Sequence, residues 1–300
     1  MPWAGMTKET IDGNVLVKVP KFWYKITNTS NELKIQISNG PQDGFSVSPA
    51  HQARNSSEND RDYVYIGRYK CNSSYKSTSS SNPKVNITRA TARSGITSLG
   101  TGYYIQDFAM FWTICMLYLV EFADWNSQAK IGYGCGNNSS VQNTGYTDNM
   151  IYHTGTTQSS RTTYGVGTQY RWIEGLWDNV LEWIDGIRFS GSSVYIYTDP
   201  STYSDSSGGT SIGSRATSSN YIKGWLVPSG TLDWALYPRS VGGSDSTYVP
   251  DYCGYGSSGV VLSVGGVYGQ YQGYGLFSLY GNSSASSSNS GIGVRLELLP

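Results

Sequence analysis

The chain has little of two residue types on which metal binding and catalysis often depend. Only two histidines, His51 and His153, occur among its 300 residues, and each is expected to be a packed or surface residue. The four cysteines are Cys71, Cys115, Cys135 and Cys253. They are far apart and form no Cys-x-x-Cys pair, so neither a zinc site nor a dense disulfide framework is predicted. Free thiols are the interpretation we favour.

Charge is also scarce. The 21 basic residues balance the 21 acidic ones, and charged residues make up 14% of the chain against roughly 25% in an average domain. A nucleic-acid partner is therefore not expected, because such proteins carry a basic patch. The most apolar run, Phe108–Phe122, is shorter than the roughly 20 residues of a membrane span, so membrane insertion is not predicted. No secretion signal is recognised at the start of the chain.

Glycine (36) and tyrosine (25) are abundant, and apolar alternation is frequent. Strands are predicted at 15–26, with an edge or bulge at Pro20, and at 33–37, 63–69, 188–198, 258–264, 275–279 and 292–299. Apolar residues at three- and four-residue spacings predict one long helix at 105–129, buried on most sides. We expect a single α+β domain over 1–300, mainly antiparallel, with insertion loops near 72–83, 133–167 and 198–220.

The segment LWDNVLEWIDG at 176–186 resembles the GNVWEW-type motif of the formylglycine-generating-enzyme branch of the C-type lectin fold. Asp178 stands at the glycine position of that motif, and Leu181 stands at its first tryptophan. The residues that match are Asn179, Val180, Glu182 and Trp183.

Both ends of the chain resemble the variable proteins of diversity-generating retroelements, of which phage tropism determinants are the best-known members. The resemblance rests on VKVPKFWYKI at 17–26, GFSVSPAH at 44–51, GG at 265–266, GLF at 275–277 and IGVRL at 292–296. It implies a C-type lectin fold whose chain ends pair as neighbouring strands, with 265–295 displayed as a ligand-binding face. It also implies a place on a phage tail or bacterial surface, and a protein or glycan receptor as partner; an oligomer is compatible with it.

The composition of the C-terminal region supports a binding face without the resemblance. Residues 252–294 contain no Lys, Arg, Asp or Glu, and tyrosines stand among many Ser and Gly. Antibody paratopes have this composition, because tyrosine gives contact area and a hydrogen bond at little entropic cost. The alternative is that tyrosine and glycine build a β-rich core. We assign the apolar residues of the region to the core: Leu276, Phe277, Leu279, Ile292 and Val294.

The genetic code adds support. In this family adenines are mutated, and an Asn codon ending in a pyrimidine then gives Tyr, Ser, Gly, Asp, Val or Asn. Gln270 and Gln272 are not such products, and are either fixed or encoded differently. The candidate ligand-binding residues, in a variable region of about 252–295, are Tyr252, Tyr255, Val267, Tyr268, Gly269, Gln270, Tyr271, Gln272, Tyr274, Ser278, Tyr280, Ser283, Ser287 and Gly291. Eight of them are expected to be exposed on one surface: Val267, Tyr268, Gln270, Tyr271, Tyr274, Ser278, Tyr280 and Ser283.

The competing hypothesis is a sulfatase-modifying-factor-like enzyme, or an inactive relic of one. Such relatives use a cysteine pair near the C-terminus, and only Cys253 lies late in this chain, so we predict no catalytic residue. No cofactor is expected, although Asn179 and Asp185 are candidate ligands for a structural Ca²⁺. A structural turn with satisfied polar groups explains these two residues equally well.

Overall fold

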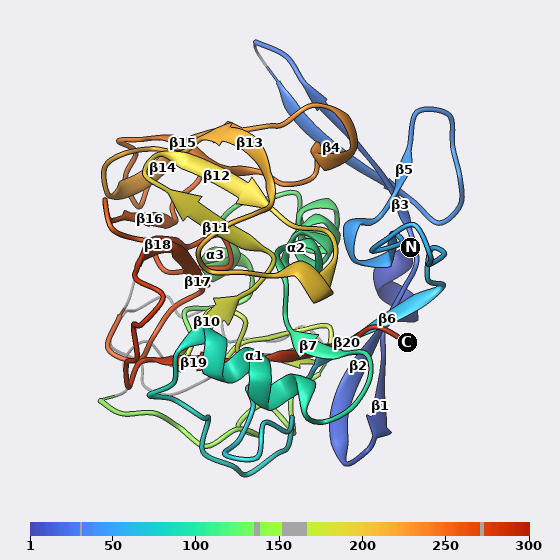
Figure 1. Ribbon diagram of the computed structural model, residues 1–300, viewed down its shortest axis with the longest axis vertical. Coiled ribbons are helices and arrows are strands. Elements are labelled where there is room, and N and C mark those ends of the chain that lie inside the picture. Colours follow the sequence, from blue (N-terminus) through green and yellow to red (C-terminus); the bar gives the residue numbers. More distant parts are fainter. Residues whose placement is uncertain (31, 135–138, 152–166, 271–272) are drawn as a thin grey trace.

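The computed structural model describes residues 1–30, 32–134, 139–151, 167–270 and 273–300. It is a mixed α+β structure that is mostly sheet. The helix α2 (Phe108–Phe122) lies at its centre, with strands around it (Figure 1). The Asp107 side chain accepts a hydrogen bond from the Met110 backbone N–H (2.7 Å) and caps its first turn. The left-handed Ala123 (φ 51°) ends it, so the helix is shorter than the predicted 105–129.

Most side chains of α2 are themselves buried, as the sequence predicts. The largest apolar cluster gathers residues from Met6 to Leu299 around it. The remaining helices are α1 (Arg89–Thr97), α3 (Ser127–Lys130) and the short 3₁₀ turns η1 (Pro2–Gly5), η2 (Pro49–His51), η3 (Pro200–Thr202) and η4 (Gly230–Leu232). In the part of the chain that the structure describes, none of the helices is both long and apolar enough to cross a bilayer.

Both ends of the chain enter one sheet, and the two termini lie on the same side of the molecule (Figure 1). Its strand order is β1 (Thr7–Ile11), β2 (Asn14–Pro20), β6 (Tyr63–Gly67), β20 (Leu296–Leu298) and β7 (Tyr103–Ile105). The terminal strands β2 and β20 are not direct neighbours, because β6 pairs with both of them. The expectation that the chain ends pair directly is therefore wrong, although both ends belong to the same sheet.

A second sheet carries the C-terminal region. Its order is β15 (Tyr237–Val241), β14 (Asn220–Leu226), β16 (Tyr252–Tyr255), β18 (Leu279–Ser283), β17 (Val261–Val264), β10 (Leu181–Ile184) and β19 (Ile292–Val294). The predicted strand at 292–299 is thus two strands, one in each sheet, and Arg295 lies between them. The predicted strand at 275–279 is wrong: 275–278 form a turn that leads into β18, because Asp251 holds their backbone in place.

Three smaller sheets complete the fold. They contain β11 (Ile187–Ser190), β12 (Ser193–Ile196) and β13 (Thr210–Ser214); β4 (Leu33–Ser38), β3 (Trp23–Asn28) and β5 (Ser46–Val47); and β8 (Gln169–Tyr170) with β9 (Ile173–Glu174). The predicted strands at 33–37 and 63–69 are confirmed as β4 and β6. The run at 15–26 breaks after Pro20 into β2 and β3, and 188–198 is a hairpin. The expected loop at 198–220 contains β13, which its Ser/Gly composition concealed.

Candidate ligand-binding face

A cavity of about 430 Å³ opens among β10, β17, β18 and β19. Most of its lining comes from the charge-free C-terminal region. The lining residues are Leu181, Ser263, Val267, Tyr268, Gln270, Tyr280, Asn282, Ser283, Asn289, Gly291 and Ile292. Among these described residues none carries a formal charge, so the polar groups that the cavity offers are hydroxyl and amide groups.

Two hydroxyl groups of this lining lack a partner. Ser263 and Tyr280 are cross-strand neighbours in β17 and β18, and they are 1% and 8% exposed. Neither hydroxyl forms a hydrogen bond with a described residue. Leaving a buried hydroxyl unpaired costs on the order of 1–3 kcal/mol. The described residues therefore leave two unpaired hydroxyl groups in the wall of this cavity.

Four tyrosine rings form a cluster beside the cavity, which we call the tyrosine cluster: Tyr221, Tyr252, Tyr274 and Tyr280. The rings of Tyr274 and Tyr280 are stacked at 6.2 Å and 5°. Tyr252 lies 6.2 Å from Tyr274 and contacts Tyr221 edge-on at 5.7 Å. Tyr221, Tyr252 and Tyr274 are half-buried, so each packed ring still presents part of its surface to solvent.

The turn that carries Tyr274 is held through its backbone. The Asp251 carboxylate accepts hydrogen bonds from the backbone N–H groups of Gly275 and Phe277, both at 2.8 Å. Ser127 Oγ accepts one from Leu276 (2.8 Å), and Gln128 Oε1 accepts one from Gly273 (3.1 Å). A Cβ on Gly275 would lie 2.5 Å from Ser127 Oγ and 2.7 Å from Asp251 Oδ1, so this position needs glycine.

Comparison with known proteins does not assign this chain to a family. No family model matches the chain, and the search of curated proteins finds no relative. The candidate site therefore rests on its own residues.

The ionisation of Asp251 gives this turn a pH dependence. Burial raises the pKa of its carboxyl group to about 7, and the two backbone N–H donors offset only part of that rise. The unfolded-state pKa is about 3.9. A raised folded-state pKa contributes stability that is complete below the unfolded value and is lost as pH rises through the folded value.

As pH rises from 5 to 8, we expect the free energy of unfolding of Asp251→Asn, which stays uncharged, to increase relative to that of the wild type. The expected gain is about 2–3 kcal/mol, because the wild type must bury a charge as it ionises. Urea unfolding at four pH values measures it, with the exposed Asp43→Asn as control. Parallel profiles for Asp251→Asn and wild type would show that Asp251 keeps one charge state across this range.

The cavity and the tyrosine cluster gather many of the predicted residues. Val267, Tyr268, Gln270, Tyr280, Ser283 and Gly291 line the cavity, and Tyr252 and Tyr274 belong to the cluster. The Tyr255 ring lies under the Arg215 guanidinium at 4.8 Å. Gly269 is exposed in a turn at φ 78°, and Ser287 Oγ accepts a hydrogen bond from the Ser284 backbone N–H. Tyr271 and Gln272 lie outside the described residues.

Two expectations of exposure are corrected. Ser278 is fully buried, and its hydroxyl donates to the Gly273 carbonyl (3.0 Å), so it stabilises the turn from inside. Tyr280 is buried because β17 and the stacked Tyr274 cover its ring, although it still lines the cavity. Ser278 lies in the turn just before β18, and Tyr280 lies in β18 itself, whose first three residues are all buried between β16 and β17. The five apolar residues assigned to the core are all buried, as predicted.

Asn179 and Asp185 are not brought together as a cation site. They lie at opposite ends of β10, and both side chains are already engaged. Asn179 Oδ1 accepts from the Gln142 backbone N–H (2.8 Å), and Asp185 forms ion pairs with Arg93 (2.6 Å) and Arg89 (3.9 Å). The structural-turn alternative is the one that these contacts favour. Within the described ranges, no group of three His, Cys, Asp or Glu side chains could hold a metal ion.

The thiols and His51 lie in the interior. Cys71, Cys115 and Cys253 are free thiols, as the sequence favours, and all three are buried; burial raises the pKa of Cys253 to about 12. His51 bonds Ser48 Oγ (2.7 Å) and the Val19 carbonyl (3.0 Å), and burial lowers its pKa to about 4. Cys135 and His153 lie outside the described residues.

Sequence reasoning missed some of the face. Tyr221 and Leu181 come from other parts of the chain, and tertiary packing alone brings them to it. Ser263, Asn282 and Asn289 lie within the predicted region but were passed over. For Asn282 and Asn289 the sequence carries a signal, since Asn is itself the template residue of the codon argument and is a natural hydrogen-bonding partner at an interface.

Proposed function

We propose that this chain is a ligand-binding protein that recognises a surface receptor, protein or glycan, through the cavity and the adjoining tyrosine cluster. The single observation that carries this proposal is the pair of unpaired hydroxyls, Ser263 and Tyr280, in an uncharged cavity beside stacked tyrosines. An interface of this chemistry binds through aromatic contact area and neutral hydrogen bonds, without the cost of desolvating charges.

The proposal extends to family and location. A C-type-lectin-type fold of the retroelement-diversified kind accounts for the motif at 176–186 and for the C-terminal glycine and tyrosine residues. It places the chain at a phage tail or on a bacterial surface. Its support is that six of the fourteen candidate residues, which were selected from the sequence alone, line one cavity.

The enzymatic alternative has less support at its expected position. Catalysis by a thiol needs a lowered pKa and an accessible sulfur. The Cys253 thiol is 2% exposed, and its pKa is raised by burial. Among the described residues, Tyr237 and Arg215 are the polar groups that act on the Cys253 thiol. No second thiol of the described chain lies beside it.

The experiment is a binding assay on panels of immobilised bacterial surface proteins and envelope glycans. We expect Tyr268→Ala and Tyr274→Ala each to weaken binding by roughly 1–4 kcal/mol, the range of aromatic hot spots. Tyr63→Ala removes a partly exposed tyrosine on β6 and is the matched control, with binding unchanged. Full binding by both tyrosine variants, with folding intact, would contradict the proposed face.

A genomic observation tests the family part separately. A neighbouring reverse-transcriptase gene, with a near-copy of the coding segment for 265–295 that differs at adenines, is expected. Its absence would remove the retroelement assignment and leave the binding face to the assay above.

A further inference from the structure

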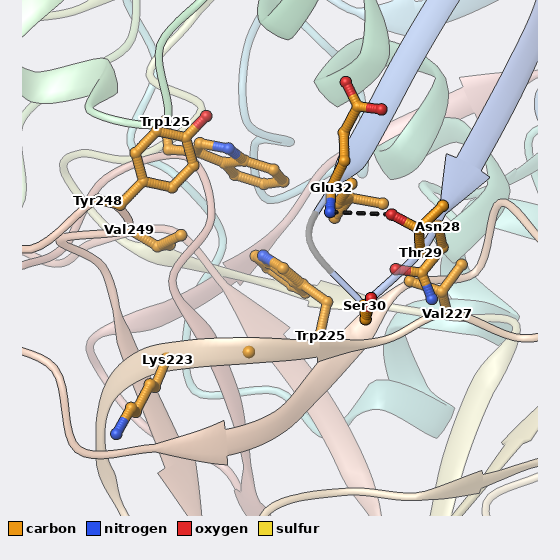
Figure 2. Close-up of a pocket in the computed structure, with 12 residues that line it drawn as sticks. Asn28, Thr29, Ser30, Glu32, Trp125, Lys223, Trp225, Val227, Tyr248 and Val249 are labelled. Atoms are coloured by element: carbon orange, nitrogen blue, oxygen red, sulfur yellow. Dashed lines mark hydrogen bonds between the residues drawn. The ribbon is translucent and has the colours of Figure 1, made fainter.

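A second hollow, of about 520 Å³, lies between the end of the β3–β4 hairpin and the edge of β14. Among the described residues, none lines both this hollow and the cavity of the binding face. Its walls carry three aromatic side chains, Trp125, Trp225 and Tyr248 (Figure 2). The site is therefore separate from the one proposed above and does not depend on it.

The aromatic side chains form a continuous group. The rings of Trp125 and Trp225 are stacked at 5.1 Å and 24°, and Tyr248 contacts Trp125 edge-on at 6.5 Å. Tyr248 is 80% exposed, which is unusual for so large an apolar ring with an adjacent hollow. Trp225 is half-buried, and its indole N–H points toward the side of Val249 without a hydrogen-bond partner among the described residues (Figure 2).

Neutral polar groups face the aromatic ones. The side chains of Asn28, Thr29 and Ser30, at the end of β3, lie across the hollow from Tyr248 (Figure 2). The turn is ordered by a hydrogen bond from the Glu32 backbone N–H to Thr29 Oγ1 (3.1 Å), drawn as a dashed line in Figure 2. Amide and hydroxyl groups can both donate and accept, as a polyhydroxylated ligand requires.

The two charged groups of the lining point away from its centre. In Figure 2 the Glu32 carboxylate and the Lys223 ammonium group are both directed outward from the space between the aromatic rings and the turn. A charged ligand would meet no counter-charge inside and would lose hydration without compensation. The lining therefore selects an uncharged molecule with one apolar face and several hydroxyl groups.

We propose that this hollow binds a neutral saccharide, with one pyranose ring against Tyr248 and the half-buried Trp225 and its hydroxyl groups toward Asn28, Thr29 and Ser30. The C–H face of a pyranose is weakly positive and matches the negative face of an aromatic ring. An adjoining hollow of about 330 Å³ shares Trp125 and Tyr248 with this one. Two adjoining hollows that share aromatic rings suit a ligand of repeated units.

Intrinsic tryptophan fluorescence tests the proposal. The probes are maltohexaose, cellohexaose and mannohexaose, with a hexamer of galacturonic acid as the charged comparison. We expect at least one neutral hexamer to change the emission saturably and the acidic hexamer to have no effect. Tyr248→Ala should weaken that binding at least about tenfold, as for an aromatic anchor. Because the Tyr248 side chain is exposed, this variant should fold normally, and Tyr63→Ala is the matched control.

The proposal is overturned by no response to any neutral hexamer at millimolar concentration, by equal or tighter binding of the acidic hexamer, or by unchanged affinity in Tyr248→Ala. Tyr268→Ala separates the two sites. If it abolishes binding of the hexamer, the sugar lies on the binding face, and this inference fails while the proposed function stands. If hexamer binding persists while Tyr268→Ala and Tyr274→Ala leave receptor binding intact, the proposed function fails and this inference stands.

Discussion

Replacing Glu182 with Gln should reduce the free energy of unfolding at pH 7 by about 3–5 kcal/mol, because the change leaves two buried cations without their counter-charge. The Glu182 carboxylate contacts Lys70 Nζ at 2.5 Å and Arg295 at 2.6 and 2.9 Å. All three side chains are 3% exposed or less. Arg295 also donates to the carbonyls of Gly67 and Glu174, so the same cluster fixes the point where the chain passes from β19 to β20.

Urea unfolding measures this change, and its dependence on pH provides a second test. Burial favours a higher pKa for Glu182, but Arg295 and Lys70 outweigh it, and the pKa is lowered. A lowered folded-state pKa contributes stability above the unfolded pKa, near 4.3, which is lost as pH falls through the folded value. The difference between the two proteins should therefore shrink on acidification. Asp62→Asn, which breaks an exposed pair with Lys21, is the control and should change little. Equal stability of Glu182→Gln and wild type at pH 7 would contradict the prediction.

Replacing Phe277 with Ala should cost about 3–5 kcal/mol of stability through loss of apolar contacts and the cavity left behind. The ring is fully buried, and its centroid lies 4.8 Å from that of Trp125, 5.9 Å from Tyr118 and 6.5 Å from Trp112. Tyr268→Ala, nearby but half-buried on the face, should cost about 1 kcal/mol or less.

Thermal and urea unfolding of the two variants, side by side, provide the measurement. Phe277→Leu keeps part of the volume and should lose less than Phe277→Ala. If Tyr268→Ala unfolds as easily as Phe277→Ala, the Tyr268 ring is a core residue, and the distinction between core and face within this segment is wrong.

The sequence alone could predict the elements whose pattern is local. The apolar run of α2, the alternation of β4 and β6, and the buried Leu276 and Phe277 all follow from periodicity and hydrophobicity. Breaks in the chain path could not be predicted, because they depend on distant partners. The turn at 275–278 looks like a strand until Asp251, 24 residues away from Gly275, accepts its backbone N–H groups.

The candidate site shows the same division. Composition and codon chemistry identify the segment that supplies Val267, Tyr268 and Gln270, but they do not say which of its side chains face inward. Tyr280 is buried because β18 lies between β16 and β17, and Ser278 is buried because its hydroxyl bonds to the Gly273 carbonyl inside the turn. Tyr221 joins the tyrosine cluster from β14, which no local pattern in 252–295 could indicate.

The contacts that hold the turn at 273–277 and the nearby residue Tyr268 are made by backbone groups. Gly273, Gly275, Leu276 and Phe277 are all bound by their backbone N–H groups, and the Tyr268 N–H donates to the Asn179 carbonyl (2.9 Å). Every L-residue except proline has that N–H, so substitution at Tyr268 or Tyr274 leaves these bonds in place. Asp251, Ser127 and Gln128 thus hold the backbone of the turn, and the side chains of Tyr268 and Tyr274 can be exchanged without loss of these bonds.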